Sequence, residues 1–191
     1  VQRDLEGAGK IVENDKKLDA LEIETERRAV QLIALRAPMA GDLRDVVAAL
    51  KISSVVERIG DYAKNIAKRV PLLDNVGNIE PVSLMPEMAR IATEMVHDVL
   101  NAFVERDADA AVRVVERDAA VDDFYNSIFR TLLTFMMENP HNIGQSTHLL
   151  FIAKNVERVG DHATNIAEMV YYAATGQHLA DRPRGTDSVK A

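Results

Sequence analysis

One stretch of the chain occurs twice with its most distinctive residues unchanged. The segment VERIGDYAKNIAKRV, from Val56 to Val70, returns one hundred residues later as VERVGDHATNIAEMV, from Val156 to Val170. Of the fourteen residues that begin at each glutamate, nine are identical, whereas Lys68 becomes Glu168. A duplication of this kind predicts a fold of two similar halves. Because some positions have changed between the two copies while others have not, the unchanged residues are expected to share a chemical role.

A second repeated pair lies upstream of the first. The segment VENDKKLD, residues 12–19, matches VERDAAVD, residues 115–122, at an offset of 103 residues instead of 100. Loops absorb such length differences easily. In both pairs the apolar residues follow the three-and-four spacing of an amphipathic helix. The pattern predicts helices over residues 4–35, 42–70, 85–106 and 109–137, and a further helix that carries the second VERVGD copy.

These helices predict an all-α fold of two tandem antiparallel three-helix bundles related by the internal repeat. We expect the bundles to span residues 1–74 and 84–175, and residues 176–191 to form a flexible tail. When the helix at 85–106 is projected back by the repeat offset, its counterpart falls before residue 1. We therefore expect the N-terminal bundle to lack its first helix. Such a bundle would expose an apolar groove that recruits a neighbouring chain, so we also expect a homodimer.

Composition excludes several classes of protein. The chain has 23 Lys and Arg against 30 Asp and Glu, a formal charge of -7, which disfavours broad binding to nucleic acid or anionic lipid. It has no cysteine, which excludes disulfides and thiol catalysis. No apolar run is long enough to cross a bilayer, and no nucleotide-binding Gly-rich loop is present. We expect a cytoplasmic protein that reaches a membrane only through partners.

Pairs of acidic residues recur at a spacing of four, which places both members of a pair on one face of a helix. Taking 100° per residue, the later pairs lie roughly opposite the apolar stripe, on the bundle surface. If two helices of a half pack antiparallel, four carboxylates approach one another on a partly exposed seam, an arrangement that favours bound cations. The paired residues are Asp15 and Asp19, Glu57 and Asp61, Asp118 and Asp122, and Glu157 and Asp161.

Other readings of the same residues stay open at this stage. Acidic residues at helical spacing usually form a solvated face, and this stripe could also bind a basic partner surface without metal. Gly60 and Gly160 lie within helices, where glycine is unfavourable, so we expect close helix packing or room for a metal. Arg58 and Arg158 are expected to form ordinary salt bridges.

A ferritin-like di-metal enzyme is the main rival, because it also places carboxylates on a helical bundle. Its sites need Glu-x-x-His on two helices. Here Glu94 to His97 supplies one such spacing on a predicted helix, and the other, Glu138 to His141, spans the Asn139-Pro140 break and does not lie on one helix. We therefore expect His97 to be a surface or packing residue and the protein not to be an enzyme.

The doubled motif, its helical setting and the Asn139-Pro140 break resemble the PhoU family of phosphate-system regulatory proteins. The resemblance spans residues 4–175 and rests on ERIGDYAKNIAKR and ERVGDHATNIAEM. It implies two similar three-helix bundles with multinuclear metal clusters on their surface, iron first, with manganese or zinc as alternatives. The family's metal-binding motif, an acidic residue followed four positions later by aspartate, is matched by the same eight carboxylates named above.

The resemblance also implies a role and partners. The family keeps the phosphate-starvation response off when phosphate is plentiful, by coupling a phosphate ABC transporter to a sensor histidine kinase. The implied partners are the kinase PhoR and the transporter ATPase PstB. The protein would then lie at the cytoplasmic face of the bacterial inner membrane and bind no nucleic acid.

Overall fold

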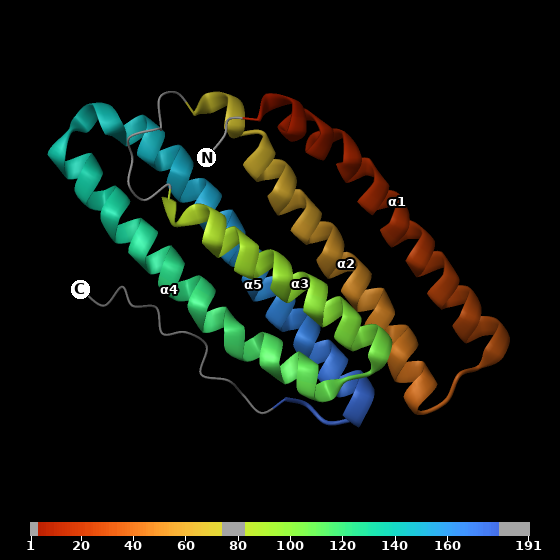
Figure 1. Ribbon diagram of the computed structural model, residues 1–191. Coiled ribbons are helices and arrows are strands. Elements are labelled where there is room, and N and C mark those ends of the chain that lie inside the picture. Colours follow the sequence, from red (N-terminus) through yellow and green to blue (C-terminus); the bar gives the residue numbers. More distant parts are fainter. Residues whose placement is uncertain (1–3, 74–82, 180–191) are drawn as a thin grey trace.

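The computed structural model describes residues 4–73 and 83–179, and every regular element among them is helical (Figure 1). The all-α prediction is therefore confirmed. The elements are α1 (Leu5–Arg36), α2 (Gly41–Ala67), the short 3₁₀ turn η1 (Val70–Leu72), α3 (Met85–Glu105), α4 (Ala108–Glu138), the 3₁₀ turn η4 (Pro140–Asn142) and α5 (Ile143–Thr175).

The helices begin and end where local chemistry predicts. The side chain of Asp4 accepts a hydrogen bond from the Gly7 amide at 2.8 Å, and Asp107 does the same for Ala110 at 2.8 Å, so both aspartates cap helix N-termini. Gly176, with φ of 75°, ends α5 in the left-handed conformation that glycine tolerates best. The predicted bounds of the first four helices agree with the structure to within about three residues.

The helices form a flat array in which α2 and α5 lie at the centre (Figure 1). The outer helix α1 packs antiparallel on α2, and α4 packs antiparallel on α5. Helix α3 lies across α4 and α5 on one face of the array. Residues of α2 and α5 that are one hundred apart in sequence therefore meet near the middle of the molecule.

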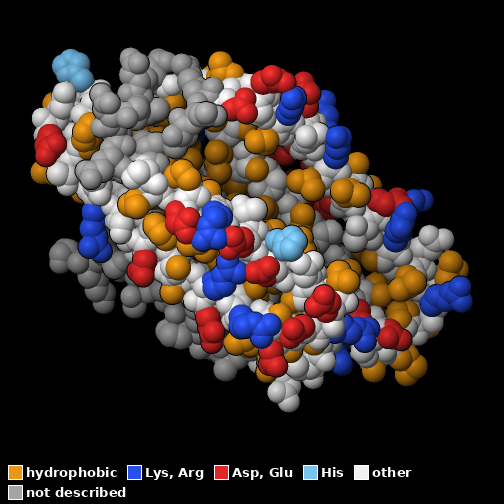
Figure 2. Space-filling view, viewed as in Figure 1, with side chains coloured by type: hydrophobic (Ala, Val, Ile, Leu, Met, Phe, Trp, Pro, Cys, Tyr) orange, Lys and Arg blue, Asp and Glu red, His pale blue; other side chains and the backbone are white. Residues whose placement is uncertain are grey.

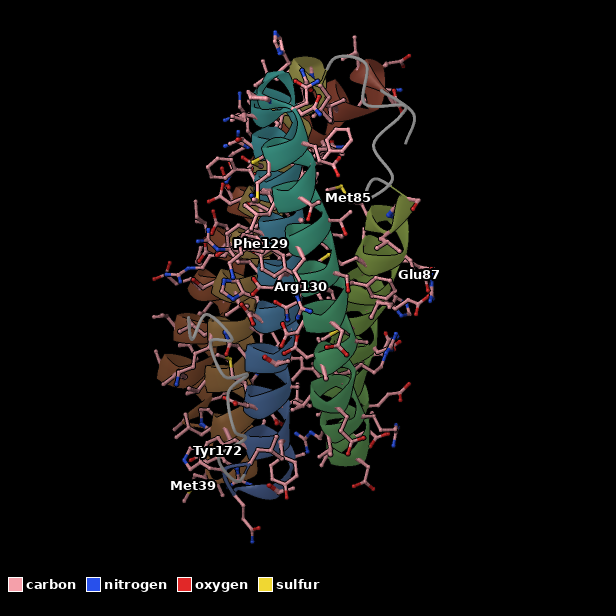
Figure 3. All side chains as sticks on the ribbon, turned by 90° about the vertical axis from the view of Figure 1, so that its left-hand side faces the viewer. Met39, Met85, Glu87, Phe129, Arg130 and Tyr172 are labelled. Atoms are coloured by element: carbon pink, nitrogen blue, oxygen red, sulfur yellow. The ribbon has the colours of Figure 1, made fainter. Side chains whose placement is uncertain are left out.

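The core is concentrated in the second half. Met88, Met95, Ile128, Leu132 and Leu149 are completely buried where α3, α4 and α5 meet. Figure 3 views this side of the molecule, with α4 nearest the viewer and Met85 at the start of α3. By contrast, the buried residues of α1 are two alanines. The second half is thus a closed three-helix bundle, whereas the described residues of the first half contribute α1 and α2.

An apolar cleft of about 350 Å³ lies between the α1–α2 hairpin and the end of α3. In Figure 2, apolar side chains show through between α3 and this hairpin. The apolar residues that line it are Leu18, Leu21, Ala49, Ile52, Val56, Leu100 and Phe103. The cleft therefore lies between the first-half helices and α3, and the groove predicted for a bundle that lacks a helix stays a prediction.

Two expectations fall largely outside the described residues. The connection between the halves includes residues 74–82, and the expected tail includes residues 180–191. Among the residues that are described, no helix combines the length and apolar character that a membrane span needs.

Candidate functional site

The four predicted carboxylates of the first half meet at the seam between α1 and α2. The ammonium of Lys64 bridges two of them, 2.5 Å from Asp15 Oδ2 and 2.6 Å from Asp61 Oδ1. Burial raises the pKa of Glu57, and the negative charges of Asp61 and Asp19 raise it further. These side chains therefore act on one another electrostatically. We call Asp15, Asp19, Glu57 and Asp61 the first cluster.

The first cluster has a neighbour that the sequence analysis missed. The negative charge of Glu22 also raises the pKa of Glu57, by more than that of Asp19 does. Glu22 lies three residues after Asp19 on α1, so extending the acidic stripe by one turn would have found it. Because the equivalent position in the second half is Tyr125, the repeat comparison gave no reason to include it.

The second cluster comprises Asp118, Asp122, Glu157 and Asp161 at the seam between α4 and α5. Lys154 donates a hydrogen bond to Glu157 Oε1 at 2.6 Å. The other oxygen, Oε2, is buried and accepts no hydrogen bond from the part of the chain that the structure describes. Burial raises the pKa of Glu157; the bond from Lys154 opposes this effect, and the charges of Asp161 and Asp122 add to it.

Glycine permits the close approach of the helices at both clusters. A Cβ atom on Gly60 would lie 2.4 Å from Leu18 Cδ1, and one on Gly160 would lie 2.9 Å from Asp118 Oδ1. The glycine in each copy therefore faces the outer helix of its own half. The prediction of close packing is confirmed, and in the second half the same gap admits a carboxylate against α5.

The predicted surface position of the later pairs was wrong for Glu157, whereas the partly exposed seam predicted for each group of four carboxylates agrees with the structure. Only 12% of the Glu157 side chain and 11% of the Asp15 side chain is exposed, and Asp118 is buried. The outer helices α1 and α4 cover this side of α2 and α5. Plotting the residues of one helix around its axis takes no account of such neighbouring helices. Asp61, at 43%, and Asp161 are open to solvent. Each cluster is thus a half-buried seam with an accessible outer edge.

The donor atoms of both clusters are carboxylate oxygens, which suit hard and borderline metal cations. The buried, unsatisfied Oε2 of Glu157 is costly without a positive partner, so a cation fits this position. Among the described residues, no three or more Asp, Glu or His side chains are arranged closely enough to hold a metal ion as they stand. Lysine ammonium groups lie against the carboxylates instead.

The rival di-metal site finds no support in the geometry. The His97 side chain is 74% exposed, and its Nδ1 lies 3.2 Å from Asn101 Nδ2. Glu94 pairs with Arg90 and, at 2.8 Å, with Arg117. The prediction that His97 is a surface residue is confirmed.

A polar contact joins the two copies of the motif at the centre of the molecule. Tyr62 Oη lies 3.1 Å from His162 Nε2, and these residues occupy the same position in the repeat. Burial lowers the pKa of His162, and the positive charges of Arg58 and Arg158 lower it further, against the opposing charge of Asp161. The expected salt bridges of the two arginines are not found within residues 4–73 and 83–179. Sequence comparison gave no signal for the contact, since tyrosine and histidine differ.

Fold and site together define a class: all-helical repeat proteins that carry one carboxylate cluster on each half. A family model described as the PhoU domain matches residues 1–70 and 85–170 of the chain. The protein belongs to the PhoU family.

Relatives and solved structures support this assignment. The phosphate-specific transport system accessory protein PhoU homolog of Zymomonas mobilis is 58% identical over 180 residues, which cover 94% of this chain and 76% of that protein. The homologue of the same name from Caulobacter vibrioides is 49% identical over 185 residues, which cover 96% of this chain and 80% of that protein. The crystal structure of PhoU from Pseudomonas aeruginosa has a TM-score of 0.86 at 34% identity and covers 92% of this chain and 84% of that one. The crystal structure of the phosphate transport system regulatory protein PhoU from Streptococcus pneumoniae has a TM-score of 0.85 at 28% identity. It covers 93% of this chain and 83% of that one.

Proposed function

We propose that this protein is a metal-binding regulatory adaptor of phosphate uptake, which keeps the phosphate-starvation response off when phosphate is plentiful. Its family membership supports the phosphate system, because relatives are named accessory or regulatory proteins of phosphate transport. The observation that carries the metal proposal is the repetition of a half-buried carboxylate cluster at the same seam of each half. The names of these relatives, accessory or regulatory proteins, support a non-catalytic role.

The eight predicted carboxylates would hold the metal, and Glu22 lies close enough to the first cluster to assist. Iron is the first candidate and manganese or zinc the alternatives, because all accept oxygen ligands. The bound ion supplies positive charge to a cluster whose inner carboxylates are costly to ionise without it. In each half the chain itself positions the donors, with the buried member at the helix seam and the aspartate four residues later at its edge.

Lysine exchange would accompany metal binding. Lys64 now forms ion pairs with both Asp15 and Asp61, and Lys154 forms one with Glu157. A metal that takes over these oxygens releases the ammonium groups to the surface. The charge pattern presented to a partner would then depend on metal loading.

The proposed partners are the sensor histidine kinase PhoR and the transporter ATPase PstB at the inner face of the bacterial membrane. An adaptor needs no catalytic group. It needs only surfaces whose charge or shape changes with the state of the protein, such as its metal loading. The two open cluster edges supply such surfaces, one in each half of the molecule.

The test uses a strain that lacks its own copy of the gene and carries a reporter of the phosphate-starvation response. In high phosphate, the native gene is expected to restore repression, and D61N/D161N is expected to leave the reporter on at equal protein level. The matched control E13Q/E116Q removes the same charge from equivalent exposed positions of the repeat and is expected to repress normally. Failure of the native gene would refute the regulatory role; full repression by D61N/D161N would refute the role of the clusters.

A second candidate function is a metal-free scaffold whose clusters dock a basic partner. The specific observation in its favour is that lysine ammonium groups already fit both clusters, at 2.5 to 2.6 Å from the carboxylate oxygens. The two candidates differ in their response to conditions. Docking of a basic partner would weaken steeply with salt and survive a chelator, whereas a metal-dependent complex would be lost to the chelator.

A further inference from the structure

Large apolar side chains remain exposed on the half of the molecule that has three packed helices. Leu133 on α4 is 46% exposed and Phe151 on α5 is 49% exposed. The exposed apolar residues of α1 lie in the half where the structure describes no counterpart of α3. By contrast, α4 and α5 already pack against α3. Completion of a three-helix bundle therefore does not account for the exposed side chains of the second half.

Ring contacts place several of these side chains on one side of the seam between α4 and α5. The ring centroids of Tyr125 and Phe129 lie 6.2 Å apart, and Lys154 Nζ lies 5.2 Å from the centroid of Tyr125. Phe151 lies three residues before Lys154, on the same side of α5, and Arg69 Cζ lies 4.1 Å from its ring centroid. Figure 3 shows Phe129 on α4, the helix nearest the viewer. The aromatic face, as we call this surface, comprises Tyr125, Phe129 and, one turn further, Leu133 on α4, with Phe151 on α5.

The repeat shows that the fold does not require aromatic residues at these positions. At three of the four positions, the equivalent residue of the first half is charged. The three pairs are Tyr125 and Glu22, Phe129 and Glu26, and Phe151 and Lys51. Because charged side chains are compatible with the equivalent seam, the aromatic face is a feature of the second half alone.

Three stretches of helix without a carboxylate meet at this surface. No Asp or Glu occurs in residues 62–73, 124–137 or 139–156, although the chain has 30 acidic residues. The stretches belong to the end of α2, the end of α4 and the start of α5, and α5 packs against both other helices. Glu138 and Glu157 lie just beyond the second and third stretches, and Glu157 is paired with a lysine of the third.

Several cations of these stretches have no carboxylate partner. Lys68, Arg69 and Arg130 form no ion pair with any residue that the structure describes, and Lys68 and Arg130 are exposed. Figure 3 shows Arg130 beside Phe129 on α4. The surface thus combines apolar rings with unpaired positive charge in a protein whose formal charge is -7. A binding partner that is both apolar and acidic complements it.

We propose that the aromatic face docks an amphipathic helix of a partner protein, whose apolar side lies on the rings and whose Asp and Glu residues lie beside Lys68, Arg69 and Arg130. Two packed helices present a shallow seam into which the apolar ridge of a third helix fits. The net charge of -7 disfavours an anionic membrane or a nucleic acid as the occupant. The inference rests on the adaptor role proposed above, and adds where a partner binds and which chemistry that partner presents.

Biolayer interferometry tests the surface with two probes, the purified transporter ATPase and the purified cytoplasmic part of the sensor kinase. L133Q/F151Q removes apolar contact area from both helices and is expected to bind about tenfold more weakly than the parent. K68E/R130E reverses two exposed charges and is also expected to bind about tenfold more weakly, with a smaller loss at high salt. The control M39Q/Y172Q removes exposed apolar side chains at the other end of the molecule and is expected to bind like the parent (Figure 3).

Circular dichroism and urea unfolding check that each variant is folded. K68E/R130E changes only exposed side chains, so it decides the outcome if L133Q/F151Q is unstable. Parent-like binding by a folded variant of either kind, or an equal loss in M39Q/Y172Q, would overturn the docking surface and leave the adaptor role intact. Failure of the parent to bind either probe would refute the proposed partners together with the surface.

Two other occupants of the aromatic face are tested with the same variants. Phosphatidylglycerol vesicles that bind the parent, but neither L133Q/F151Q nor K68E/R130E, would identify a membrane surface and overturn the proposal. Light scattering that finds a dimeric parent and monomeric variants would identify a second copy of this chain as the occupant and would also overturn it.

Discussion

The two motif glycines are predicted to respond differently to the same substitution, with a loss of stability at Gly160 and little change at Gly60. Alanine is favoured over glycine within a helix by about 1 kcal/mol. At Gly160 the added methyl group would meet Asp118 Oδ1 at 2.9 Å and Val121 Cγ1 at 3.4 Å, both held where α4 packs on α5. Overpacking a well-filled site costs about 1 to 3 kcal/mol, so G160A is expected to lower the free energy of unfolding by about 1 kcal/mol net.

At Gly60 the neighbour can move. The methyl group would meet Cδ1 of Leu18, the far end of a flexible side chain that borders the apolar cleft. Turning a side chain toward a less favourable rotamer costs about 0.5 to 1.5 kcal/mol, which roughly offsets the gain in helix propensity. G60A is therefore expected to leave the free energy of unfolding close to that of the parent.

Urea unfolding of the metal-free proteins, followed by circular dichroism, measures both changes. Gly9, on α1, is the control, because a methyl group there meets no other atom within 4 Å and G9A should stabilise the protein by up to about 1 kcal/mol. If G160A stabilised the protein as much as G9A does, the close approach of Asp118 to α5 would not exist in solution and the reasoning would be refuted.

Three further predictions concern pH, capping and assembly. Because the folded-state pKa values of Glu57 and Glu157 are raised, these two carboxyls favour folding as pH falls from about 7 to 5, whereas the lowered pKa of His162 opposes folding in the same range. The metal-free parent should therefore gain stability relative to E57Q/E157Q as pH falls, and a difference in stability between the two proteins that does not change with pH would contradict this prediction. Removing the N-cap of α4 in D107A should cost about 1 kcal/mol in thermal or urea unfolding, while E116A on the exposed face of the same helix should change stability little. The homodimer remains a prediction: light scattering after gel filtration should give twice the chain mass of 21.1 kDa, and a value of 21.1 kDa would exclude it.

Sequence periodicity predicted the helices well because the apolar residues of each helix mark the face that the helix buries. The apolar stripes and the breaks at Pro38, Gly41 and Pro140 determine where helices form, and local capping by Asp107 needs no tertiary information. The repeat also selected carboxylates that the fold brings together. These features depend on neighbours along the chain, which a single sequence displays.

The remainder of the site depends on packing between helices, which a single helix does not encode. The burial of Glu157 arises because α4 covers that side of α5. The bridge from Lys64 to Asp15 joins residues 49 positions apart, and the Tyr62–His162 contact joins residues 100 apart.

The most direct test of the account is elemental analysis of the protein purified without a metal-affinity tag. The parent and E13Q/E116Q are expected to contain several equivalents of iron, manganese or zinc per chain, and D61N/D161N to lose most of the metal while keeping its helical content. Little metal in the parent, even after exposure to each metal and buffer exchange, would contradict the central claim that the repeated carboxylates form metal sites.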